Sequence, residues 1–299
     1  MAIQRSVPIF GVGFALAAAF SNGTVGVFSR KSFEAGMDHY EVAFWRCAIA
    51  LSVATIMVFL SKGCYSKLLL SFRGSWRIAI CSALGIFTLY HFETQAFNYA
   101  SIPLVSILVF AGGIGAILLD VLILKEQITL RKMLAMAMVF TGGIAIVAGD
   151  GLSAGTTKGV LLSLAAGLGY ASFIFAWKFF RLTSSKENFW WFLAYGCAML
   201  SVPFILSEPS LPSTEALPSL ISLGLIPSFL GFFCTILAVQ HIEAYKTQVI
   251  ESSEPLFSAT FAILFFGEWL TELGMLAALI VILGAAITCL PEKKCKSRN

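Results

Sequence analysis

Charged side chains are scarce in this sequence of 299 residues. Asp, Glu, Lys and Arg together make up 12% of it, whereas hydrophobic residues make up 58% and the mean hydropathy is +0.88. A soluble globule of this length would need far more polar side chains to cover its surface. The scarcity of charge therefore argues against a soluble protein and predicts an integral membrane protein.

Motifs for nucleotides and metals are lacking as well. No Gly-rich loop ends in Lys followed by Ser or Thr, which excludes a P-loop ATPase within this chain. The seven cysteines show no paired spacing typical of metal ligands, and we expect them to act as small apolar side chains. We expect no cofactor, no metal and no enzymatic activity. An intramembrane enzyme and a channel or receptor-like sensor stay open as alternatives.

Ten long apolar stretches fill most of the chain. Each can cross a hydrocarbon core of about 30 Å, which takes roughly 20 helical residues. Runs of this length without polar alternation favour helices over barrel strands. The predicted fold is all-α, with ten transmembrane helices. The spans are expected at 7–29, 40–60, 76–97, 102–124, 133–149, 159–180, 189–207, 217–240, 247–266 and 274–290.

The first stretch also has features of a signal peptide. Arg5 precedes an apolar run that contains three consecutive alanines at 17–19, a small-residue pattern typical of cleavage sites. The run continues beyond these alanines to Phe28, and it has a counterpart later in the chain. We therefore expect this stretch to be retained as the first span.

The basic residues predict the orientation of the helices. With the N-terminus in the cytoplasm, 16 of the 20 Lys and Arg fall on the cytoplasmic side; three (Arg30, Lys31 and Lys158) fall outside, and Arg46 lies within a span. Cytoplasmic loops are rich in Lys and Arg, and one missed crossing would invert every later loop. We expect both termini in the cytoplasm and a location in the cytoplasmic (inner) membrane. The net charge of +4 reflects this bias and requires no nucleic-acid partner.

An internal repeat divides the chain into residues 1–150 and 151–299. Residues 96–145 align without a gap on residues 238–287, at an offset of 142, so that Glu126 meets Glu268. The beginnings of the halves align at an offset of 148, where Gly11 meets Gly159. Five helices in each half would insert the second half upside down relative to the first. Inverted repeats of this kind place a substrate site at their interface and support alternating access.

Three segments resemble a known family. Residues 124–129 (LKEQIT), residues 266–271 (FGEWLT) and Ser253-Glu254-Pro255 are similar to the paired EamA domains of the drug/metabolite transporter superfamily. The resemblance implies a ten-helix carrier that moves small metabolites, often amino acids or their relatives, and frequently as an exporter. The family usually carries a proline where this chain has Gly113, aligned with Pro255, so the two halves are expected to bend differently.

The expected partners follow from this class. They are a small-molecule metabolite and the lipid bilayer, with protons as a candidate coupling ion. The protein is expected to be a monomer or a weak homodimer.

Arg46 and Glu93 are charges within predicted spans. At about 1.5 Å per helical residue, both lie within roughly 10 Å of the outer surface, in neighbouring helices. We expect them to pair, either as a structural link or as an outer gate or substrate contact. His91, on another face of the same helix, is either a proton relay or a neutral hydrogen-bonded side chain.

The ninth span has the densest group of polar residues. Gln248, Glu251 and Glu254 recur every three residues and form a polar stripe. Pro255 removes one helical hydrogen bond next to them. A partly broken helix beside two carboxyls could bind a cation, a proton or a substrate amine. Glu251 could instead pair with a lysine near the inner surface.

Further candidates lie on other spans. Tyr170 and Trp177 share a face of the sixth span, and Asn22 occupies the equivalent depth of the first. They either pack the bundle or line a cavity for a substrate with an apolar or planar body. Asp120 and Lys178 are candidates for a gate or a structural ion pair near the inner surface.

The ten-span topology can be tested in intact cells. We expect a Ser153→Cys variant to react with a membrane-impermeant thiol reagent added outside, because the loop between the halves faces out. A matched variant, Thr183→Cys, should react only after permeabilisation. Reaction of Ser153→Cys only after permeabilisation would contradict the ten-crossing topology.

Overall fold

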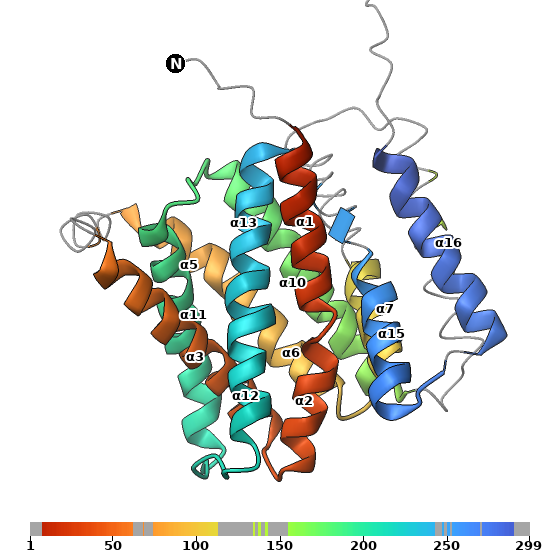
Figure 1. The fold of residues 1–299 in the computed structure, drawn as a ribbon, viewed down its shortest axis with the longest axis horizontal. Coiled ribbons are helices and arrows are strands. Elements are labelled where there is room, and N and C mark those ends of the chain that lie inside the picture. The colour runs from red at the N-terminus through yellow and green to blue at the C-terminus, as the bar shows by residue number, and fades with distance from the viewer. Residues whose placement is uncertain are drawn as a thin grey trace, which may run out of the picture.

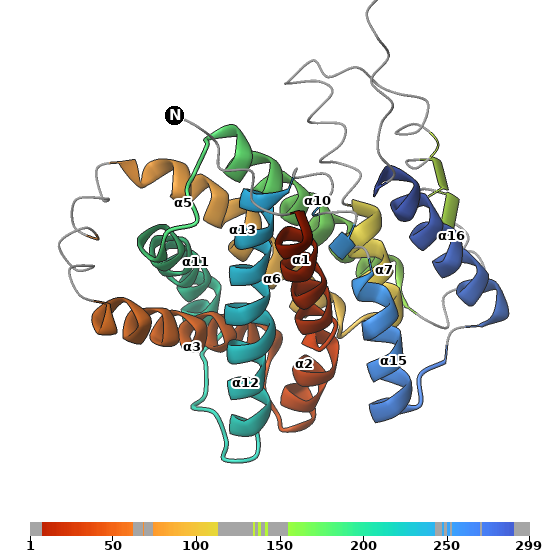
Figure 2. The ribbon, with the colours of Figure 1, turned by 45° about the horizontal axis from the view of Figure 1, so that its top comes forward.

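The computed structural model describes residues 8–61, 68, 74–112, 134, 137–138, 141–142, 155–242, 247, 250–251, 253–269 and 271–289. Within these residues the chain is helical throughout and contains no strand, only an isolated bridge between Ala100 and Gly155. Figure 1 shows the helices as one bundle, with α1 and α13 side by side and α16 at one edge. The view in Figure 2 shows the same neighbours. The all-α prediction is confirmed for the described residues.

The described helices include two π-helical elements that continue directly from α-helices. In chain order they are α1 (Pro8–Asn22), α2 (Val25–Glu34), α3 (His39–Leu60), α5 (Trp76–Ser82), η2 (Ala83–Thr88), α6 (Leu89–Ala96), α7 (Ile102–Gly112), α10 (Thr157–Phe179), α11 (Lys186–Leu206), α12 (Leu217–Leu223), η4 (Gly224–Gly231), α13 (Phe232–His241), α15 (Glu254–Phe266) and α16 (Glu272–Cys289). The elements η2 and η4 are π-helical.

In the described part of the chain, five helical segments are long and apolar enough to cross a membrane. They are Ile9–Glu34, His39–Leu60, Thr157–Phe179, Lys186–Leu206 and Leu217–His241. Three shorter apolar helices lie at Ile102–Gly112, Glu254–Phe266 and Glu272–Gly284. The predicted third span is one continuous helical segment over 76–96. The spans predicted at 102–124 and 133–149 fall largely outside the described residues.

The first span is longer than predicted. Its expected end at residue 29 is wrong, because α2 continues past Arg30 and Lys31, which were assigned to an outer loop. Both charges have partners on the helix surface. Arg30 forms an ion pair with Glu268 and donates to the Ala100 carbonyl at 3.1 Å, and the Lys31 ammonium lies 4.6 Å from the centre of the Phe265 ring. A partnered charge does not have to end an apolar helix.

Close backbone contact joins α7 to α10. A Cβ atom added at Gly167 would lie 2.0 Å from the Val109 carbonyl oxygen and 3.0 Å from Gly112 Cα. Both nearest atoms belong to the backbone, so a rotamer change cannot relieve the clash. Small residues of this kind let membrane helices approach closely.

Gly167→Ala should separate these two helices. Overpacking a core typically costs about 1–3 kcal/mol, so we expect a lower unfolding temperature in detergent. Gly13→Ala is the matched control, because nothing lies within 4 Å of its added Cβ. Alanine is favoured over glycine in a helix by up to about 1 kcal/mol, so the control should not lower the unfolding temperature. Equal melting of both variants would contradict the close packing.

Candidate functional site

Among the described residues, five carboxyl or guanidinium side chains are buried: Glu41 belongs to the cap of α3, and the other four lie within the bundle. Arg46 in α3 is 1% exposed, Glu93 in α6 is 5% exposed, Glu251 is 0% exposed and Glu254, at the start of α15, is 5% exposed. A charge removed from water is unfavourable unless it is paired or hydrogen-bonded. The partners of these four groups therefore define the candidate site.

The Arg46 guanidinium has partners on two sides. Its Nη2 lies 3.1 Å from a Glu93 carboxylate oxygen, and its Nη1 donates to Thr94 Oγ1 at 3.2 Å. The plane of the guanidinium covers the Tyr90 ring, with 3.4 Å between its carbon and the ring centre. Charge-assisted hydrogen bonds and a cation–π contact together offset the desolvation of the arginine. The pairing of Arg46 with Glu93, predicted from their depths, is present.

Three buried donors near this pair have no hydrogen bond among the described residues. They are Arg46 Nε, Tyr90 Oη and Ser228 Oγ. The Tyr90 side chain is close enough to both Arg46 and Ser228 to interact with them. Buried polar atoms are nearly always satisfied in stable structures. Of these three side chains, Arg46 alone lines the cavity described below, so its Nε is the donor that a polar ligand there could use.

The helix of the predicted ninth span is interrupted, and α15 begins at Glu254. Pro255 lies in the first turn of α15, where its missing N–H costs no helical hydrogen bond. Helical residues 250–251 precede this point, and Ser253 lies in a turn between them and α15. The helix is therefore interrupted between Glu251 and Glu254, next to Pro255 where the sequence predicts a partly broken helix, and the two carboxyls have different surroundings.

Glu251 is bound by two hydroxyl groups. Tyr170 donates to its Oε2 at 2.6 Å, and Thr235 donates to its Oε1 at 2.7 Å. Lys178, considered from the sequence as a partner, has an exposed side chain near the end of α10 and forms no ion pair with Glu251 in the described part of the chain. Glu251 is thus held by hydroxyls from α10 and α13.

Glu254 faces a small cavity of about 20 Å³. Asn22, at the end of α1, is within side-chain hydrogen-bonding range of its carboxylate. The lining residues are Asn22, Val25, Arg46, Leu89, Glu93, Val109, Phe110, Tyr170, Pro227, Phe232 and Glu254. A volume of this size has room for about one water molecule. A metabolite can enter only if the surrounding helices move apart.

The structure brings together Arg46, Glu93, Glu254, Asn22 and Tyr170, five of the residues singled out from the sequence. Other candidates lie elsewhere. Trp177 packs against Phe173 and Phe192, with ring centres 5.8 and 5.6 Å away. His91 stacks on Phe87 at 5.4 Å, and its Nδ1 has no hydrogen bond among the described residues. Gln248, Asp120 and Gly113 lie outside the described residues.

Two residues of the site were missed from the sequence. Thr235 contacts Glu251, and Tyr90 lies beneath Arg46. The repeat offset of 142 could have pointed to Thr235, because it aligns this residue with Glu93. Tyr90 lies three residues before Glu93, so the two share a face of one helix. That spacing was the available signal.

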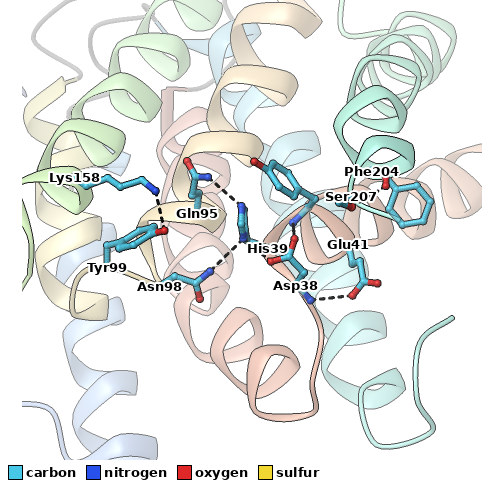
Figure 3. A network of polar contacts seen from close by, with 10 residues as sticks. Asp38, His39, Glu41, Gln95, Asn98, Tyr99, Lys158, Phe204 and Ser207 are labelled. Atoms are coloured by element: carbon cyan, nitrogen blue, oxygen red, sulfur yellow. Dashed lines mark hydrogen bonds and ion pairs between the residues drawn. The ribbon is translucent and has the colours of Figure 1, made fainter. Parts of the chain in front are cut away.

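A second polar network surrounds His39 at the start of α3, as Figure 3 shows. His39 Nδ1 lies 2.7 Å from an Asp38 carboxylate oxygen and 3.4 Å from Asn98 Nδ2, and its Nε2 lies 3.0 Å from Gln95 Nε2. These contacts connect the first turn of α3 to the end of α6. None of these residues lines the cavity. The sequence pointed to His91, whereas His39 is the histidine of this helix pair with polar side-chain partners.

Comparison with known protein families shows which family this chain belongs to. The pattern of the EamA-like transporter family matches residues 9–148 and again residues 157–290. The chain belongs to this family. The resemblance found in the sequence is confirmed, and this EamA-like chain is a membrane transporter with transmembrane helices.

One curated protein and one solved structure resemble this chain over nearly its whole length. A Haemophilus influenzae protein described as an uncharacterized transporter is 21% identical over 311 residues, which cover 99% of this chain and all of that protein. A protein of known crystal structure has a TM-score of 0.72 at 16% identity, covering 93% of this chain and 96% of that one. The second likeness concerns the fold alone.

The Arg46–Glu93 pair of this transporter can be measured with a double-mutant cycle. Removing one partner leaves a buried charge unpaired and should cost about 3–5 kcal/mol of stability, whereas removing both should cost much less. We expect Arg46→Met and Glu93→Met each to lower the free energy of unfolding strongly, and the double variant to recover part of the loss. Additive losses would mean that the two side chains do not interact.

Proposed function

We propose that this protein is a secondary-active transporter, an exporter or exchanger, for small metabolites such as amino acids or related compounds. It works by alternating access between two inverted five-helix repeats, residues 1–150 and 151–299, with ten membrane crossings. Protons are the proposed coupling ion. Both termini face the cytoplasm, and the protein resides in the cytoplasmic (inner) membrane.

The position of the cavity carries this proposal. Its lining comes from both segments that match the family: Asn22, Arg46, Glu93 and Phe110 are among those from the first, and Tyr170, Pro227, Phe232 and Glu254 come from the second. A site shared by two repeats opens to one side or the other when the repeats exchange conformations. A static pore does not require this arrangement.

Local helix geometry supports the repeat. The π-helical segment η2 covers residues 83–88, and an offset of 142 moves it to 225–230, within η4. Such segments are rare and occur often at functional sites. An offset of 148 moves Asn22 onto Tyr170, and both line the cavity. Equivalent positions of the two halves therefore meet at one site.

One contact between the halves has the character of a gate. Glu268, from the second half, forms an ion pair with Arg30 and accepts a hydrogen bond from the Ile102 backbone N–H at 3.2 Å. Arg30 and Ile102 belong to the first half. Any motion that separates α2 from the end of α15 must break this contact, so it favours the closed arrangement at that end of the bundle.

The polar groups of the site favour a substrate that carries one negative and one positive group. Arg46, whose Nε has no hydrogen bond among the described residues, and the Glu254 carboxylate both line the cavity. Phe110 and Phe232 provide apolar walls. A carboxylate near Arg46 and an amine near Glu254 would satisfy both sides, as in an amino acid.

Glu254→Gln tests the role of the cavity carboxylate. Glutamine preserves size and hydrogen bonding but cannot ionise, so the protein should fold while gradient-driven transport in proteoliposomes falls sharply and its pH dependence flattens. Substrates are first identified by a thermal-shift screen of amino acids, nucleobases and related metabolites at two pH values, since ligand binding stabilises the native state. Glu272→Gln, at an exposed carboxyl in the first turn of α16, is the control.

Counterflow separates a carrier from a channel or sensor. Proteoliposomes loaded with an unlabelled hit from the screen should transiently accumulate the labelled compound. No counterflow with any hit would contradict a carrier. A well-folded Glu254→Gln variant with an unchanged rate and pH profile would show that this carboxyl is structural.

A further inference from the structure

The two carboxyls of the ninth span have different environments. Glu254 lines the cavity, whereas Glu251 is absent from its lining and is fully buried. One residue belongs to both environments: Tyr170 lines the cavity and donates its hydroxyl to Glu251 at 2.6 Å. We propose that Glu251 carries the coupling proton and that Tyr170 links its protonation to the occupancy of the cavity. This inference rests on the proposed function, because it assigns the ion site of the same carrier.

The ionised form of Glu251 has a complete set of donors. Each carboxylate oxygen accepts one hydroxyl hydrogen bond, from Tyr170 at 2.6 Å and from Thr235 at 2.7 Å. Both donors are themselves buried, Tyr170 at 3% exposed and Thr235 at 0%. Hydroxyl donors offset part of the desolvation of a carboxylate, and an adjacent cation would offset more. No Lys or Arg contacts Glu251 within the described part of the chain.

The neighbouring elements determine which other charges Glu251 meets. From α10 it faces Tyr170, from α13 the Cys234 thiol and Thr235, and from α15 the Glu254 carboxyl. The Arg46–Glu93 pair lies on the far side of Glu254, in reach of that carboxyl. The described helices α1, α7 and η4 carry no ionisable side chain. The described surroundings thus hold acids and hydroxyls, and a proton is the cation that fits between them.

Thr235 can switch from donating a hydrogen bond to ionised Glu251 to accepting one from protonated Glu251. Its hydroxyl also lies 3.2 Å from the Gly231 carbonyl, one turn earlier in its own helical segment. When a hydronium ion transfers a proton to Glu251 Oε1 and is left as water, the new O–H donates to Thr235 Oγ1, and the threonine hydrogen turns to the Gly231 carbonyl. No covalent bond breaks other than the one that delivers the proton. Every hydroxyl in the group keeps an acceptor.

Protonation of Glu251 weakens the hydrogen bond that it accepts from Tyr170. Its hydrogen bond to Glu251 changes from a charged to a neutral acceptor, and charge-assisted hydrogen bonds are roughly twice as strong as neutral ones. The tyrosine ring is then freer to move with the cavity wall. By reciprocity, a substrate that displaces Tyr170 removes a donor from ionised Glu251. Proton and substrate therefore influence each other through one hydroxyl group.

Infrared difference spectroscopy of the purified protein tests this with the proton alone as the probe. Between about pH 9 and 5, a range that brackets perturbed carboxyls, we expect a carboxylic C=O band that titrates in the wild type and is missing in Glu251→Gln. Tyr170→Phe should shift this band. Tyr195→Phe is the matched control. It removes a tyrosine hydroxyl of α11 that is hydrogen-bonded to Ser75 and does not line the cavity.

Several outcomes would overturn the proposal. An unchanged titration spectrum in Glu251→Gln means that Glu251 binds no proton in this range. A band that Tyr170→Phe leaves in place means that Tyr170 does not link the two sites. If Glu251→Gln does not fold, Glu251→Asp keeps an acid one methylene further back, and it must shift the same band.

Transport assays separate this inference from the proposed function. With a compound that the wild type exchanges by counterflow, Glu251→Gln should lower accumulation driven by a pH gradient much more than it lowers counterflow. Retained gradient-driven accumulation would overturn the proton role of Glu251 and leave the carrier function standing. Absence of wild-type counterflow would instead refute the carrier, and the infrared result would still decide whether Glu251 binds a proton.

Discussion

An ionised arginine inside a membrane bundle needs hydrogen-bonding and aromatic partners in place of water, and these partners determine how the neighbouring helices pack. Arg46 meets this requirement with Glu93 and Thr94 from α6 and with the Tyr90 ring from the same helix. These contacts hold α3 against α6. The other faces of these two helices lie against η4 and the cavity. Gly224 in η4 packs against the next turn of α3, where an added Cβ would lie 2.5 Å from Ile49 Cγ2 and 3.3 Å from the Arg46 carbonyl oxygen. The packing of α3 against α6 depends on this one buried charge.

The two proposed repeats satisfy their buried acids in different ways. The offset of 142 places Thr235 where the first half has Glu93, and Phe232 where it has Tyr90. The first half therefore holds its carboxylate with a guanidinium, and the second holds Glu251 with two hydroxyls. An ion pair resists changes of charge, whereas a carboxyl held by hydroxyls can gain or lose a proton with small rearrangements. In the mechanism proposed above, one half positions the substrate and the other responds to pH.

The sequence predicts the parts of this structure that depend on burial alone. Apolar runs predict the helices, and the depths of Arg46 and Glu93 predict their pairing, because neighbouring antiparallel helices bring equal depths together. The hydroxyl partners of Glu251 were not predicted, because serine, threonine and tyrosine are tolerated at many positions in membrane helices and carry little signal. The continuation of the first helix past Arg30 was also missed. It depends on Glu268, which is 238 residues away in the chain.

The interruption between α1 and α2 lies against the first turns of α15. A Cβ added at Gly23 would be 2.6 Å from Phe257 Cβ, and the Phe20 ring packs edge-on against Phe257 and Phe261, with ring centres 5.4 and 5.6 Å away. Two broken helices, one from each end of the chain, therefore share a single joint. A tilt of either helix at its break would change its contacts with the other at this joint. Asn22 and Glu254, which line the same cavity within hydrogen-bonding range of each other, would then move together.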